Sequence, residues 1–142
     1  MSTPSWWAEL IGVSRVLAAT DHAELVDWRG GPDTDEADED DVPPLTTRLG
    51  ALGRVFAERV DEFTPQQRQE VLRIVERIQA SGGEVDRTAV ATGFLEALLN
   101  AWDRGFDLRS IWPDMGRESR AYCLAWNRFG GVESPEWMQQ TG

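Results

Sequence analysis

The sequence predicts an all-α fold, a single-domain bundle of five to seven helices with an acidic loop. Apolar residues recur at steps of three and four along most of the chain, which is typical of helices with one buried face. The length of 142 residues, with 41% hydrophobic and 27% charged residues, suits one globular domain with a real core. We find no internal repeat and no hairpin signal such as Asn-Gly between alternating strands.

The predicted domain has three parts. Residues 1–31 form a Trp-rich helical segment, residues 32–44 an acidic, Pro-flanked loop or linker, and residues 45–142 the helical core of the same domain. Residues 4–19 predict a first helix, because apolar side chains recur there at helical spacing. The stretch that follows, up to Gly30, fits either a second short helix or an irregular strand.

The core begins with two helices that have clear boundaries. Residues 45–62 place leucines, valine and phenylalanines on one stripe and charged residues mostly outside it, so they predict an amphipathic helix. The next helix starts with Thr64 as N-cap, Pro65 at the first position and Gln67 at the third, which is a capping-box arrangement. It is expected to end at about Ala80, before two glycines.

Residues 85–103 carry apolar groups on most sides and therefore predict the central helix. Gly93 costs about 1 kcal/mol relative to Ala in a helix interior, so it indicates close approach of a neighbouring helix. A short helix ending at Pro113 and a longer one ending at Gly130 follow. In the tail, Trp137 and Met138 are the expected anchors.

Two pairs of tryptophans are expected to differ in burial. Trp102 and Trp126 fall on helix faces that we expect to be buried in the core. Trp112 and Trp137 lie next to prolines at segment ends, where we expect exposure. Because tryptophan is enriched at binding hot spots, an exposed pair in an acidic chain would suit a protein partner.

The sequence contains no recognisable catalytic, metal or cofactor motif. Cys123 is the only Cys and His22 the only His, which excludes an internal disulfide and a Cys/His zinc cluster. All fourteen bases are Arg, so lysine-based chemistry is absent. Cys123 is expected to be a small buried hydrophobe. We therefore expect no enzyme activity, no cofactor and no metal.

Charge is the most pronounced feature, with a formal net charge of −11. Such a field repels phosphates and attracts basic proteins, so direct nucleic-acid binding is not expected. No segment approaches the length of a membrane span and no signal peptide is apparent, so we expect a cytoplasmic protein without membrane contact. The acidic run consists of Asp33, Asp35, Glu36, Asp38, Glu39, Asp40 and Asp41. Two interpretations fit it: a solvated loop, or a segment that attracts a basic partner electrostatically.

Residues 48–130 resemble a bacterial family of small acidic helical proteins. The resemblance rests on an "ATGFLE"-type motif, here Ala91–Glu96, and on a "GRESRAYC"-type turn and helix, here Gly116–Cys123. Relatives of this kind are often encoded beside interbacterial toxins, which implies a role as an immunity protein. The family implies no catalytic residues.

The main functional hypothesis is an immunity protein that occludes the active site of a cognate toxin with a basic cleft. The seven acids of the run are the candidate contacts, with Trp112 or Trp137 as apolar anchors. The alternative is a helical adaptor or regulatory subunit that binds a host protein. A carboxylate enzyme with a divalent metal has the least support, and a homo-oligomer remains open.

Overall fold

The structure is a computed structural model that describes residues 4–30 and 42–139. Throughout these two stretches the secondary structure is helical, with no β-strand. The α-helices are α1 (Ser5–Ile11), α2 (Arg15–Trp28), α3 (Leu45–Glu58), α4 (Pro65–Ser81), α5 (Glu84–Val90), α6 (Glu96–Asp103), α7 (Arg117–Phe129) and α8 (Glu136–Gln139). Because the π-helical turn η2 (Ala91–Leu95) joins α5 to α6, these make seven separate helical rods. The all-α prediction is confirmed.

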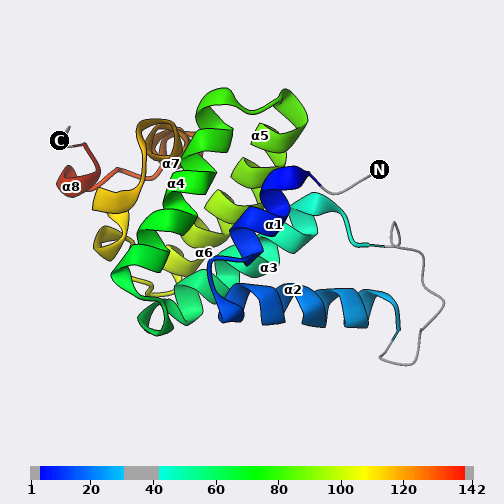
Figure 1. Cartoon of the computed structure of the whole chain (residues 1–142). Coiled ribbons are helices and arrows are strands. Elements are labelled where there is room, and N and C mark those ends of the chain that lie inside the picture. The colour runs from blue at the N-terminus through cyan, green and yellow to red at the C-terminus, as the bar shows by residue number, and fades with distance from the viewer. Residues whose placement is uncertain (1–3, 31–41, 140–142) are drawn as a thin grey trace.

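The rod formed by α5, η2 and α6 lies at the centre of the bundle (Figure 1). Helix α3 packs along η2 and α6, α2 packs on α3, and α4 contacts both α5 and α7. The largest fully buried side chains come from α1, α2, α3, α4 and the central rod and include Leu10, Leu17, Leu49, Leu52, Phe56, Leu72, Ile74, Phe94, Leu95 and Leu98. One hydrophobic core therefore joins the N-terminal helices to the rest of the chain.

The N-terminal segment differs from its prediction, because residues 4–19 form two helices and not one. Helix α1 ends at Ile11, and α2 begins after Ser14, whose hydroxyl accepts a hydrogen bond from the Val16 N–H at 3.1 Å. Ser14 lies in extended backbone, as an N-cap requires. The uncertain stretch up to Gly30 is helical, and Gly30 itself has a φ of +85°.

A buried ion pair ties the first three helices together. Arg48 on α3 donates to the two carboxylate oxygens of Asp21 on α2, at 2.9 and 2.7 Å. The indole N–H of Trp7 on α1 donates to the same carboxylate at 3.3 Å, and its ring lies 4.5 Å below the Arg48 guanidinium. Only 4% of Asp21 and 5% of Arg48 is exposed. These contacts fix the positions of α1 and α2 on the core.

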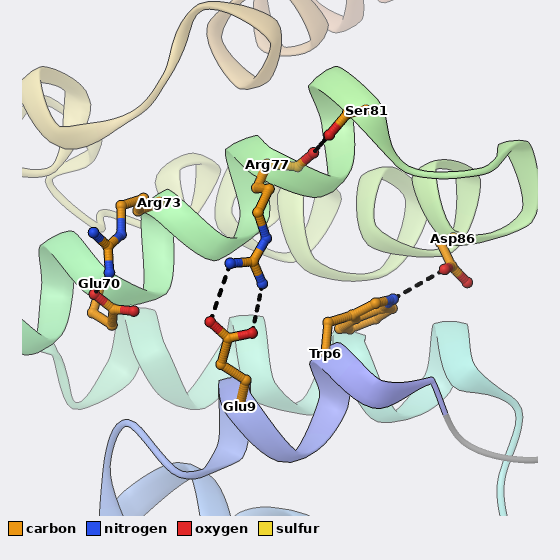
Figure 2. A network of polar contacts seen from close by, with 7 residues as sticks. All are labelled: Trp6, Glu9, Glu70, Arg73, Arg77, Ser81 and Asp86. Carbon is orange, nitrogen blue, oxygen red and sulfur yellow. Dashed lines mark hydrogen bonds and ion pairs between the residues drawn. The ribbon is translucent and has the colours of Figure 1, made fainter.

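Polar contacts also hold α1 against α4 and α5 from outside (Figure 2). Glu9 on α1 accepts two hydrogen bonds from Arg77 on α4, at 3.1 and 2.6 Å, and these bonds lower the pKa of Glu9. One turn earlier, the Trp6 indole donates to Asp86 on α5 at 3.0 Å. The exposed ion pair contributes little to stability, so these contacts mainly define the orientation of α1.

The capping box predicted for α4 is confirmed. The Thr64 hydroxyl accepts from the Gln67 N–H at 3.1 Å, and the Gln67 side chain accepts from the Thr64 N–H at 2.9 Å. The helix runs to Ser81, one residue beyond the expected end. Local sequence signals were sufficient here because all the donors and acceptors lie within four residues.

The close helix approach predicted at Gly93 is also confirmed. A Cβ atom there would lie 2.6 Å from the Thr46 carbonyl oxygen and 2.8 Å from the Leu49 Cβ. Gly53 on α3 makes the reciprocal approach, since its Cβ would lie 2.7 Å from the Phe94 carbonyl oxygen. Gly93 lies within the π-helical turn η2, a local insertion that apolar periodicity did not predict.

Helix α7 is capped by a side chain from another helix. The carboxylate of Glu76 on α4 accepts from the Glu118 N–H, the Ser119 N–H and the Ser119 hydroxyl, each at 2.9 Å. Gly116 leaves room for this carboxylate, because a Cβ there would lie 2.1 Å from the Glu76 Cγ. A negative charge at a helix N-terminus is favourable, so the Glu76 carboxylate stabilises the start of α7. The same contacts link α4 to α7.

Candidate partner-binding site

The seven acids of the acidic run lie outside the described residues, so their role as partner contacts stays a prediction. The run contains seven acids and no base. It therefore supplies seven of the eleven net negative charges and leaves four to the rest of the chain. The electrostatic attraction expected for a basic partner is concentrated in one short segment of the sequence.

The expected exposure of Trp112 is wrong. Trp112 is 4% exposed and lies in the short 3₁₀ turn Trp112–Asp114, under α7 and α8. Its ring contacts Trp137 edge-to-face at 5.6 Å, and Trp137 contacts Trp102 in the same way at 5.8 Å. Trp137 is half-buried by these contacts. The two predicted anchors therefore hold α8 to the core, together with the buried Met138.

Trp28 is the exposed tryptophan nearest in sequence to the acidic run. It is the last residue of α2, is 51% exposed, and precedes Asp33 by five residues. Asp27 beside it is also exposed. The sequence predicted exposure for Trp112 and Trp137 and made no prediction for Trp28, because a helix ending at Gly30 was only one of two interpretations of this stretch.

A second exposed aromatic surface lies on α7. Trp126 is 36% exposed and Phe129 is 93% exposed, so the predicted burial of Trp126 is wrong. The buried face of α7 is formed by small and polar residues, Ser119, Cys123 and Asn127. Periodicity alone assigns the aromatic face to the core, whereas the fully buried residues of α7 form the adjacent face. A shared face for Trp126 and Phe129 was visible in the sequence, but not the direction in which it points.

The two motifs of the family resemblance contact each other. Glu96 of the first motif accepts a hydrogen bond from the Tyr122 hydroxyl of the second at 2.7 Å. Burial and the Glu96 carboxylate both raise the pKa of Tyr122, so this phenol stays protonated. Gly93 and Gly116 serve close packing in the same two motifs. The motifs thus have clear structural roles in joining η2, α4 and α7.

A groove of about 510 Å³ lies between α3 and α6 beside this contact. Its charged lining consists of two arginines and two glutamates, Arg54, Arg104, Glu58 and Glu96. These charges balance, so the groove has no net preference for an anion or a cation. It lacks the signature of a basic or acidic binding site.

The candidate catalytic side chains occupy unremarkable positions. His22 is exposed, and its neighbour Asp21 is engaged by Arg48. Within residues 4–30 and 42–139, no group of three or more His, Cys, Asp or Glu side chains is placed to hold a metal ion. Cys123 is fully buried, as expected for a small hydrophobe.

The thiol of Cys123 should react far more slowly in the native than in the unfolded protein. Burial raises its pKa from 9.0 to about 12. The smaller thiolate fraction should therefore slow labelling by a disulfide reagent at about pH 8 roughly 1,000-fold relative to urea-unfolded protein. Because the unfolded chain loses the thiol proton at a lower pH than the folded chain, the free energy of unfolding should be unaffected by this group below pH 9 and should fall as pH rises from 9 toward 12. Labelling of native protein at the unfolded rate would contradict this burial.

Comparison with known proteins gave no match to any family model, curated protein or solved structure. Across the helices that the structure describes, none is both long and apolar enough to cross a lipid bilayer.

Proposed function

We propose that this protein is an immunity protein that acts in the cytoplasm, binding a cognate bacterial toxin enzyme and covering its basic active-site cleft. The observation that carries the proposal is Trp28, which is half exposed at the end of α2 and precedes the first acid of the run by five residues in the sequence. An exposed aromatic anchor close in sequence to a concentration of negative charge would suit a basic protein cleft.

The two parts of this surface have different physical roles. The seven acids attract a basic cleft over long distances and take the place of the anionic substrate groups that the cleft binds. Long-range attraction mainly raises the association rate constant. Trp28 offers a large apolar contact that loses little conformational entropy, so it mainly lowers the dissociation rate constant. Helices α1 to α3 support this anchor through the buried contacts of Asp21 and Arg48.

Replacing the seven acids by Ser and Asn should slow association with the toxin by about 10- to 1,000-fold at low salt. The same variant should show a flatter dependence of the association rate on salt concentration. The partner is first recovered from native cells with the tagged chain at low and moderate salt, and identified by mass spectrometry. Stopped-flow mixing of purified proteins then gives the association rate.

Trp28→Ser should leave association nearly unchanged and raise the dissociation rate by about tenfold or more. Trp126→Ser is the matched control, because Trp126 is an exposed tryptophan on a different surface. Unchanged kinetics in the acid-free variant would refute electrostatic capture. A stoichiometric housekeeping partner without toxin activity would support the adaptor alternative.

A further inference from the structure

Residues 133–139, which include α8, pack on the bundle as a small separate unit. Before them, α7 ends at a turn in which Gly131 has a φ of +71° and the Val132 N–H donates to the Asn127 carbonyl at 2.7 Å. This turn completes the hydrogen bonding of α7. We call residues 133–139 the strap. Helix α8 of the strap lies at the edge of the bundle, beside α7 and away from α1 and α2 (Figure 1).

The backbone of the strap is hydrogen-bonded locally. The Met138 N–H donates to the Pro135 carbonyl at 3.0 Å, and the Gln139 side chain donates to the Ser134 carbonyl at 2.7 Å. Asn127 on α7 links the strap to the bundle, because its side-chain amide donates to the Ser134 hydroxyl at 3.0 Å and to the Met138 sulfur at 3.6 Å. The strap can therefore leave the bundle without breaking a backbone hydrogen bond of α7. A one-turn helix is not stable by itself, so α8 depends on its contacts with the core.

Two side chains of the strap make its apolar contacts. Met138 is 2% exposed, whereas Trp137 is only half-buried between Trp102 and Trp112. Among the residues that the structure describes, the buried indole N–H of Trp112 has no hydrogen-bond acceptor. A buried donor without an acceptor costs free energy. The packing around Trp112 that the strap completes is therefore less favourable than its apolar area suggests.

We propose that the strap opens and closes over Trp102 and Trp112 while the rest of the bundle stays folded. Few contacts hold it closed, namely the packing of Met138 and Trp137 and the hydrogen bonds of Asn127. Segments with few buried contacts open with a much smaller free energy than the whole protein needs to unfold. Opening exposes the indole surface that Trp137 covers, so the strap controls access to that surface.

Hydrogen exchange of the full-length chain, followed by NMR, distinguishes local opening from global unfolding. The Met138 N–H is hydrogen-bonded within the strap, so its exchange reports the loss of the α8 turn. It should exchange at least about 100-fold faster than the N–H of Val75, in the buried stretch of α4. Because local opening exposes little surface, low concentrations of urea should accelerate exchange at Val75 but hardly at Met138.

Two similarly buried methionines provide matched variants. Met138 in the strap is 2% exposed, and Met115 in the core, directly after the turn Trp112–Asp114, is 3% exposed. Met115→Ala should clearly lower the midpoint of urea unfolding, as truncation of a core side chain does. Met138→Ala should lower it by about half as much or less, since this variant can lose no more stability than the strap gains by closing. It should also accelerate exchange of the amide at position 138 by up to about tenfold.

Two results would overturn the opening of the strap. Exchange at Met138 with the rate of Val75 and the same dependence on urea would show that the strap leaves the core only when the whole protein unfolds. Equal losses of the unfolding midpoint in Met115→Ala and Met138→Ala would show that the strap belongs to the cooperative core. Neither measurement needs a partner, so the outcome is independent of the proposed toxin binding.

Discussion

Replacing Arg48 by Met should lower the free energy of unfolding by about 3–5 kcal/mol. The change removes both hydrogen bonds from Arg48 to Asp21 and leaves that carboxylate buried with only the Trp7 indole as donor. An unpaired buried charge is strongly destabilising. Urea unfolding followed by tryptophan fluorescence measures the change.

The double variant Asp21→Leu, Arg48→Met is the control. It removes both charges and substitutes apolar groups, so its cost should be clearly below the sum of the two single changes. A loss of less than about 1 kcal/mol for Arg48→Met would show that water solvates Asp21 and would contradict its burial. Because Arg48 joins α3 to α1 and α2, Arg48→Met should also weaken the proposed contact of Trp28 with a toxin.

Gly93→Ala should destabilise the protein by about 1–3 kcal/mol, although Ala is the better helix former. The added methyl group would meet the backbone of α3 at the Thr46 carbonyl, which lies 2.6 Å away, and the Leu49 Cβ at 2.8 Å. Backbone atoms cannot move aside as a flexible side chain can, so α3 must shift from the central rod. The midpoint of urea unfolding should fall with little change in its slope.

Gly50→Ala is the matched control, because Gly50 lies in α3 at the same interface. The nearest atom to its added Cβ is the Gly93 carbonyl oxygen at 3.9 Å, an ordinary contact. This variant should therefore gain up to about 1 kcal/mol from helix propensity. Equal effects of the two substitutions would show that the interface does not distinguish these positions.

The elements predicted most accurately are those whose signals are local. The α4 start depends on Thr64 and Gln67, which satisfy each other within one turn, and the sequence specifies both. The break between α1 and α2 was missed for the opposite reason. Trp7, Leu10 and Leu17 keep helical spacing across it, yet Ser14 caps a new helix that turns so that all three reach one core.

Residue exposure could not be obtained from periodicity in α7. The sequence shows two faces, one aromatic and one formed by Ser119, Cys123 and Asn127. The buried face is the polar one because Glu76 binds Ser119, and Asn127 donates to Ser134 at 3.0 Å. Both partners are distant or lie beyond the helix, so hydrophobicity alone points to the wrong side. Trp112 was expected outside for a different reason, its position next to Pro113 at a segment end, yet the 3₁₀ turn that contains it is buried.

The sequence by itself determined the helical class, the capping box of α4, the close packing at Gly93 and the concentration of negative charge before α3. Each of these follows from residues near one another in the chain. The tertiary structure decided which aromatic residues face outward: Trp28, Trp126 and Phe129 are exposed, whereas Trp112 is buried. Burial depends on side chains supplied by other helices. The sequence of a helix with two plausible faces therefore does not specify which face those side chains will cover.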